Sequence, residues 1–263
     1  MRGHNHSIEL FSDYFAQESN ILAAIDARVK IVFVLALLAL ILASANPGVL
    51  IITPILCIII LLLVGIPYKV LAMRLAGPLF MAAIILLIQT FLYGSTPLYS
   101  ISLGGLNMPV YREGLSKGLL IGGRVVAGTS LVLFLSLTTS LNRMLGALKY
   151  FRFPDEWLEV LAFTYRYIFV FIEEAQTIMD AQRLRLGYRG ASIALRSWGT
   201  LVGSLFTRVY DQANATYAAM VLRGYNGTLY IKSPVSLNKF DLKATFLFIL
   251  VFLLLLMMSL YGG

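Results

Sequence analysis

The chain has 263 residues, of which 59% are hydrophobic and only 13% are charged. Because a soluble globular domain carries about a quarter charged residues, this composition excludes an ordinary soluble protein and indicates an integral membrane protein. The formal net charge of +8 is typical of a membrane protein whose basic loops face anionic lipid, and it does not favour a nucleic-acid partner.

The first 29 residues mix acidic side chains with His4 and His6, and they lack the apolar core of a cleavable signal peptide. Two imidazoles alone make a weak metal site, and a solvated terminus is the simpler interpretation of this segment. We therefore expect no metal site in this chain.

Apolar runs of about 20 residues predict membrane crossings, because that length spans the hydrocarbon core. The five runs are residues 30–45, 47–64, 77–93, 118–139 and 244–261. Asn46 and Pro47 predict a tight connection between the first two. Arg124 lies near the start of the fourth run, where we expect it to snorkel to the nearer interface; pairing with an acid inside the bundle is the alternative.

Basic residues predict the orientation of these spans, since they collect on the cytoplasmic side. Of the 21 lysines and arginines, 13 lie between residues 140 and 243, and others precede the first and third spans. With five spans, this distribution predicts a multi-pass inner-membrane protein with a cytoplasmic N-terminus and an extracytoplasmic C-terminus. The loop of residues 94–117 has only a weak charge signal.

The polar block after the fourth span predicts three helices, over residues 141–150, 154–186 and 192–222. Residues 157–172 are apolar enough to suggest a sixth crossing. Glu159 and Arg166 lie within that stretch, and charges at mid-bilayer cost several kcal/mol, so an interfacial or bundle-facing helix is favoured. The sequence leaves open whether the two long helices cross or pack antiparallel.

A short pattern occurs twice, at the ends of the two long helices. Ala181 precedes Arg185 by four residues, and Ala219 precedes Arg223 by the same interval, so alanine and arginine share a helix face. A glycine lies within two residues after each arginine, Gly187 in the first copy and Gly224 in the second, and suits a left-handed helix end. Each copy predicts a helix tip that presents a cation beside a shallow gap, as expected for gripping a partner.

At these residues the chain resembles the transmembrane (T) component of energy-coupling factor transporters, whose two long coupling helices end in Ala-x-x-x-Arg-Gly-like motifs. The second copy fits cleanly, whereas the first has Leu186 between the arginine and the glycine, which leaves Arg183 as an alternative for the family arginine. Residues 25–30 read Ile-Asp-Ala-Arg-Val-Lys and are similar to the Asp-Pro-Arg-x-Lys start of the first span. Residues 164–175 resemble the CbiQ subgroup, which serves cobalt or nickel uptake.

The resemblance implies an all-α polytopic protein with about five transmembrane helices. Residues 1–139 would form the N-terminal segment and spans one to four, residues 140–243 the cytoplasmic coupling domain, and residues 244–263 the last span. The ATPase-docking residues would be Ala181, Arg185, Gly187, Ala219, Arg223 and Gly224.

The implied partners are two ABC-type ATPases, a substrate-binding membrane S component resembling CbiM, a small accessory membrane subunit and the lipid bilayer. ATP and Mg would be bound by the ATPases, with no cofactor and no catalytic residue in this chain. The expected function is ATP-driven cobalt import, with nickel or a vitamin as the alternative cargo. A membrane-embedded enzyme and a stand-alone channel or carrier are the hypotheses from other classes.

Overall fold

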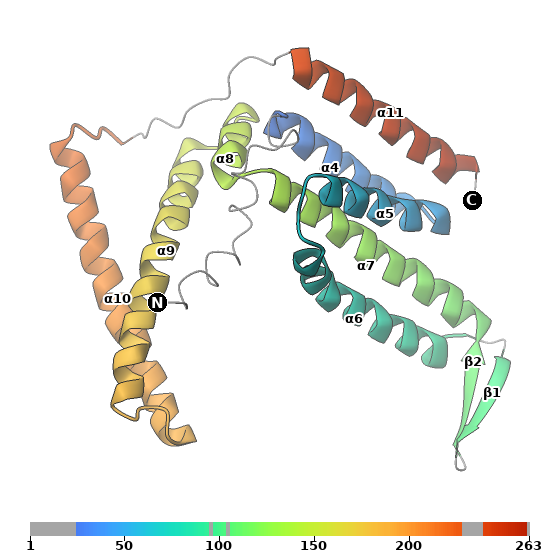
Figure 1. Cartoon of the computed structure of the whole chain (residues 1–263), viewed down its shortest axis with the longest axis horizontal. Helices are drawn as coiled ribbons and strands as arrows, with labels where there is room; N and C mark the ends of the chain where they lie inside the picture. The colour runs from blue at the N-terminus through green and yellow to red at the C-terminus, as the bar shows by residue number, and fades with distance from the viewer. Residues whose placement is uncertain (1–24, 95–96, 104–105, 228–238, 262–263) are drawn as a thin grey trace. The chain divides into compact units, whose positions relative to one another are not determined.

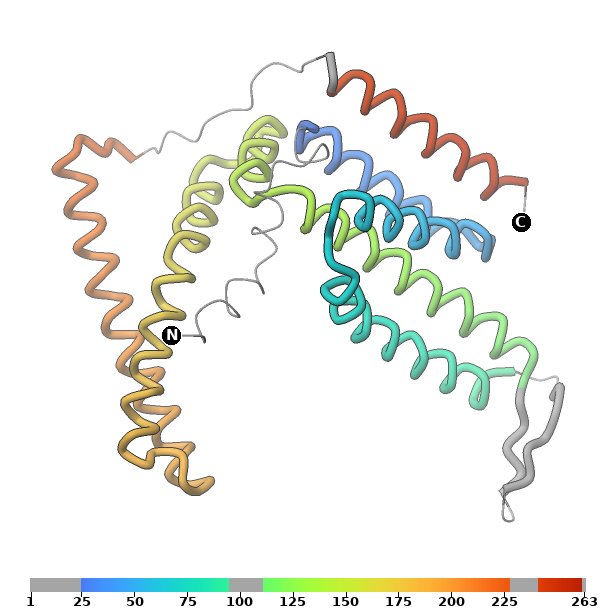
Figure 2. Tube along the Cα trace, viewed as in Figure 1, coloured from blue at the N-terminus to red at the C-terminus, as the bar shows by residue number. Residues whose placement is uncertain are grey.

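The computed structural model describes residues 25–94, 97–103, 106–227 and 239–261 (Figures 1 and 2). It divides into two compact units. The first combines Met1–Met144 with Val235–Gly263, and the second is Leu145–Pro234. The predicted coupling domain, residues 140–243, begins five residues before and ends nine residues after this second unit.

The helices of the first unit are α4 (Ala27–Ala43), α5 (Pro47–Leu63), α6 (Tyr68–Leu92), α7 (Arg112–Thr138) and α11 (Lys239–Tyr261). Among the described residues, α6, α7 and residues Asp241–Tyr261 of α11 are long and apolar enough to cross a membrane, and α5 is a shorter apolar helix. Each of the five predicted apolar runs lies mainly on one of these helices. The predicted class, an all-α polytopic membrane protein, is confirmed.

Two helices begin earlier than the apolar runs that predicted them. α6 starts at Tyr68 rather than at residue 77, and α7 starts at Arg112 rather than at residue 118. The additional turns carry Lys69, Arg74 and Lys117. Lysine and arginine interrupt a hydropathy window but have good helix propensity, so each helix begins before its apolar run does.

α7 is the central helix of the first unit, since it contacts α4, α5 and α6 (Figure 1). The core on its surface includes Ala127, Leu131 and Phe134, all buried against residues of α4 and α5. Close packing against α6 depends on Gly114, because a Cβ there would meet the backbone oxygens of Gln89 and Tyr93. Small residues at such crossings allow two membrane helices to pack backbone to backbone.

The connection between α4 and α5 is the tight turn that Asn46 and Pro47 predicted. The Asn46 side chain accepts a hydrogen bond from the Gly48 N–H and so caps α5, and Pro47 occupies the first turn. The same side chain donates to the Met258 carbonyl at 2.7 Å, which connects the turn to α11.

Arg124 donates to the Ser44 carbonyl at 3.0 Å. Arg124 thus binds a backbone oxygen at the end of α4. Its snorkelling to the nearer interface stays a prediction.

Between α6 and α7 the chain forms an antiparallel hairpin of β1 (Pro97–Leu103) and β2 (Leu106–Tyr111), in which Ser102 pairs with Asn107. The lack of a long apolar run predicted a loop over residues 94–117. The segment is short and has no strong alternation of apolar and polar residues, so strand pairing was not evident from the sequence.

The second unit contains most of α8 (Leu141–Tyr150), all of α9 (Asp155–Leu184) and all of α10 (Ala191–Leu222). The predicted range of α8 is confirmed, and those of the two long helices are correct to within about two residues, the usual uncertainty of helix ends. α9 runs unbroken through residues 157–172 and is not among the described helices that are apolar enough to span a membrane.

Candidate functional site

α9 and α10 form an antiparallel hairpin, which resolves the alternative that the sequence left open. Four contacts connect the two helices along their length, from the connecting turn to the far end: Gln182 with Ser197, Glu174 with Arg208, Tyr167 with Thr216, and Glu159 with Tyr225. Residues earlier in α9 pair with residues later in α10 or just after it. Arg185 and Arg223 therefore lie at opposite ends of the hairpin.

The two helix ends have the same backbone geometry. Arg185 is the C-cap of α9 with φ −88° and ψ 13°, and Arg223 is the C-cap of α10 with φ −91° and ψ 7°. Each is followed by a residue with positive φ, Leu186 at 59° and Gly224 at 86°.

The hydrogen bonds that close the two ends also match. The Gly187 N–H donates to the Gln182 carbonyl at 2.8 Å, and the Tyr225 N–H donates to the Met220 carbonyl at 3.0 Å. These are the long bonds of a Schellman motif, in which the last carbonyls of a helix accept from residues beyond its end.

This match makes Arg185 the structural equivalent of Arg223. Arg183, the alternative, lies inside the last turn of α9, and its guanidinium pairs with Asp180 at 3.1 Å. Leu186, rather than Gly187, occupies the left-handed position that was predicted for the glycine.

Gly187 is needed for a different reason, because other atoms lie too close to its Cα to leave room for a side chain. A Cβ at this position would lie 2.7 Å from the Ser197 hydroxyl and 2.9 Å from the Gln182 carbonyl oxygen. Any side chain would therefore push the α9 end away from the first turns of α10. Gly224, by contrast, has open space around it and a φ of 86°, so it serves as the flexible backbone position expected at a helix end.

Both tips present the same side chains to solvent. Ala181, Arg185, Ala219 and Arg223 are all exposed. Each arginine is preceded by a leucine that is almost fully exposed, Leu184 at 87% and Leu222 at 88%. Within the described part of the chain, no ion pair involves Arg185 or Arg223. Each tip thus combines an unpaired guanidinium with an adjacent exposed leucine.

Polar contacts that the sequence did not predict hold the first tip against α10. Gln182 donates to the Ser197 carbonyl at 2.9 Å, and the Ser197 hydroxyl donates to the Gly187 carbonyl at 2.7 Å. Tyr188 donates to the Gln182 side-chain oxygen at 2.6 Å.

The second tip is held against α9 by Tyr225, whose hydroxyl donates to Glu159 at 2.9 Å. This hydrogen bond to the carboxylate raises the pKa of Tyr225 above its ordinary value of 10.0, so the phenol remains protonated and donating at neutral pH. A tyrosine follows the glycine in both copies of the pattern, and this was the sequence signal for these contacts.

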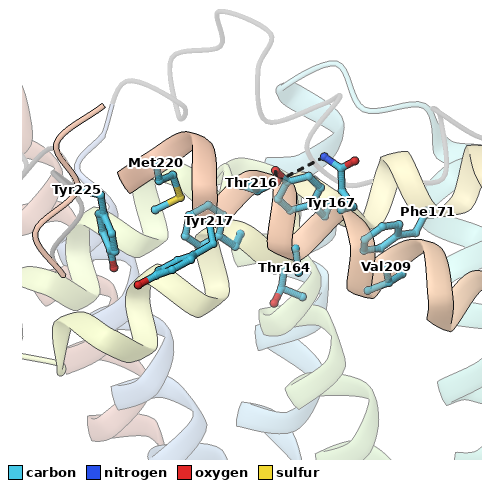
Figure 3. A pocket seen from close by; sticks show the side chains of 11 residues that line it. Thr164, Tyr167, Phe171, Val209, Thr216, Tyr217, Met220 and Tyr225 are labelled. Atoms are coloured by element: carbon cyan, nitrogen blue, oxygen red, sulfur yellow. Dashed lines mark hydrogen bonds between the residues drawn. The ribbon is translucent and has the colours of Figure 1, made fainter. Parts of the chain in front are cut away.

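Between the tips, α9 and α10 line a cavity of about 370 Å³, and aromatic side chains form part of its walls (Figure 3). Phe163, Tyr167 and Phe171 line it from α9, and Thr216, Tyr217 and Met220 line it from α10. The Tyr167 and Thr216 hydroxyls lie 2.8 Å apart and bridge the two helices. The lining is mainly apolar.

Among the described residues, no three histidine, cysteine, aspartate or glutamate side chains gather as a metal site would require. His4 and His6 lie outside the described residues.

These features define a polytopic α-helical membrane protein with a helical hairpin that carries two equivalent cationic tips. The cobalt transport protein family CbiQ matches residues 18–234, and the chain belongs to this family. It is a membrane component of that transport family.

Three curated relatives illustrate the similarity. An uncharacterized protein of Methanocaldococcus jannaschii is 32% identical over 82% of this chain and 81% of its own length. A putative fused cobalt transport protein CbiMQ of Methanocorpusculum labreanum is 32% identical over 64% of this chain and 28% of its own length. The cobalt transport protein CbiQ of Rhodobacter capsulatus is 29% identical over 59% of this chain and 63% of its own length.

Proposed function

We propose that this chain is the T component of an energy-coupling factor importer for cobalt ions, which transmits ATP-driven motion from two cytosolic ATPases to a substrate-binding membrane subunit. The observation that carries the proposal is the pair of equivalent tips, Arg185 and Arg223, at opposite ends of one antiparallel hairpin. The family assignment supports the transport role.

The arrangement of the tips suits a partner with two-fold symmetry. Two antiparallel helices with the same end geometry are related by an approximate two-fold axis across the hairpin. Two ATPase subunits related by such an axis would offer equivalent grooves, one to each tip. α9 has 30 residues and is therefore about 45 Å long, a separation suited to one ATPase per tip.

The chemistry of each tip suits docking into a polar groove with an apolar floor. A guanidinium makes several charge-assisted hydrogen bonds to carboxylates or carbonyls, and the leucine beside it would be removed from water on contact. Burying one leucine side chain is worth about 1.5–3 kcal/mol. Because ATP and Mg would be bound by the ATPases, this chain needs no cofactor or catalytic group of its own.

We infer a CbiM-like membrane protein as the substrate-binding partner, because one relative is named as a CbiM and CbiQ fusion. A small accessory membrane subunit completes the proposed complex. Cobalt is the proposed cargo because it appears in the family description. The selective metal site would then belong to the CbiM-like partner.

The test is a double charge reversal, Arg185→Glu with Arg223→Glu, in the chain expressed with its ATPases. Charge repulsion in both grooves should abolish co-purification of the ATPases and leave the size-exclusion profile of the membrane protein unchanged. The matched control is Arg189→Glu with Arg196→Glu, which makes the same charge change at exposed positions near the first tip but outside both caps. Undiminished co-purification of the Arg185/Arg223 variant would refute the docking role.

A further inference from the structure

The first turn of α4 contacts both places where the chain passes between the two units. One is the end of α7, from which the chain continues into α8. Lys30 is completely buried, and its ammonium donates to the Thr138 carbonyl at 2.8 Å, with the Thr139 hydroxyl at 3.5 Å. Thr138 and Thr139 end α7, and α8 begins at Leu141. A buried ammonium therefore binds the carbonyl end of the last helix before the second unit.

The other place is the start of α11, to which the chain returns from the second unit. The Asp26 N–H donates to the Asp241 carboxylate at 2.9 Å. Beside this contact, Ile25 packs in a small buried cluster with Ala244 and Phe248. Phe33, one turn beyond Lys30, stacks on Phe248 with ring centroids 4.3 Å apart.

The same turn is itself rigidly capped. The Asp26 side chain accepts a hydrogen bond from the Arg28 N–H, and the Arg28 guanidinium lies 3.6 Å from the Asp26 carboxylate. Ala27 occupies the first helical position, where its N–H needs no partner within the helix. Residues 26–30 thus form a fixed point from which contacts extend to α7 and to α11.

We propose that this turn, the α4 clamp (Asp26 to Lys30), holds both connections of the second unit to the membrane bundle and is required for transmitting motion rather than for binding ATPases. The inference rests on the proposed coupling function. A helical hairpin can move a membrane partner only if its attachments to the bundle resist the force. A loose attachment would dissipate the motion in local unwinding at the end of α7 and the start of α11. Lys30 and Asp26 are therefore positioning residues.

The experiment uses the full complex and the Lys30→Met variant, which keeps most of the side-chain volume and removes the ammonium. We expect unchanged co-purification of the ATPases and retained ATP hydrolysis. We also expect uptake of Co²⁺ by cells to fall by about tenfold or more, because a hydrogen bond from a charged donor is lost. Hydrogen exchange at residues 138–144 should quicken by a similar factor. The control is Lys117→Met, which removes a lysine that bonds the Tyr93 hydroxyl at the opposite end of α7.

A second pair of variants tests the contact between the α4 clamp and α11. Asp241→Asn keeps a side-chain oxygen that accepts from the Asp26 N–H, and should preserve Co²⁺ uptake. Asp241→Ala removes the acceptor, and should lower uptake while the ATPases remain bound. This pair keeps the proposal testable if Lys30→Met does not fold.

The outcomes separate the two proposals. If the unmodified chain fails to bind ATPases, the coupling function is wrong. If the Lys30→Met complex binds ATPases, and both it and Asp241→Ala import Co²⁺ at the unmodified rate, the clamp is wrong while the coupling function stands.

Discussion

Leu186 has a conformation that glycine usually adopts at a helix end. Its φ of 59° falls in the left-handed region, where the equivalent residue of the other tip is Gly224. A left-handed conformation costs a residue with a Cβ about 1–2 kcal/mol. The Leu186 side chain is 58% exposed, so packing returns little of that cost. The first tip therefore carries local strain that the second tip avoids.

Replacing Leu186 with glycine should stabilise the protein. Relief of the left-handed strain is worth about 1–2 kcal/mol. The greater flexibility of glycine in the unfolded chain costs about 0.5–1 kcal/mol, so we expect the free energy of unfolding to rise by up to about 1 kcal/mol. The measurement is thermal unfolding of the full chain in detergent. The reverse change, Gly224→Leu, is the matched control and should lower the unfolding temperature. A lower unfolding temperature for Leu186→Gly would contradict the assigned backbone geometry.

At the scale of elements, the antiparallel pairing of α9 and α10 determines where the two copies of the repeated pattern lie. The pairing depends on contacts between residues far apart in the chain, such as the Glu174–Arg208 ion pair and the Tyr167–Thr216 hydrogen bond. Parallel or splayed helices with the same sequence would place the arginines differently. The pairing places the two copies of the motif at two separate ends of the hairpin.

Chemical cross-linking tests this register directly. The Tyr167→Cys and Thr216→Cys pair should be joined efficiently by a short bifunctional maleimide, because their side chains meet across the hairpin. The one native cysteine, Cys57, is buried and can be replaced by alanine in the same chain. Tyr167→Cys with Ser197→Cys is the control, since position 197 lies about 28 Å along α10 from position 216. Equal cross-linking of the two pairs would exclude the antiparallel register.

At the scale of the whole molecule, function depends on which side of the membrane carries the tips. ATPases are cytosolic, so both tips must be cytoplasmic for the proposed coupling. The five predicted spans and the basic residues between positions 140 and 243 favour that side. The end of α11 should then be extracytoplasmic.

Cysteine labelling of intact cells checks this orientation. In the Cys57→Ala chain, Tyr261→Cys should react with a membrane-impermeant maleimide added outside, because it lies at the exposed end of α11. Ile193→Cys, which is exposed near the first tip, should react only after the cells are permeabilised. Labelling of Ile193→Cys in intact cells would place the tips outside and remove the basis for ATPase docking.

The sequence alone determined the membrane class, the apolar helices and the positions of the two arginines. These features depend on local properties, namely hydropathy, helix-ending residues and a motif that can be read in a few consecutive residues. The same local patterns could not predict the β1–β2 hairpin, nor could they show that Leu186 takes the left-handed position. A strand pairing and a helix-end conformation both depend on neighbours that hydropathy does not reveal.

Only the tertiary structure decided that α9 and α10 pack antiparallel, that Arg124 binds the Ser44 carbonyl, and that Lys30 and Asp26 join α4 to α7 and α11. Each of these is a contact between residues distant in the chain. A single sequence specifies which groups need a partner, such as a buried ammonium or a helix-end carbonyl. It does not specify which of many chemically equivalent partners will be brought within hydrogen-bonding distance, because that choice is made by the packing of whole helices.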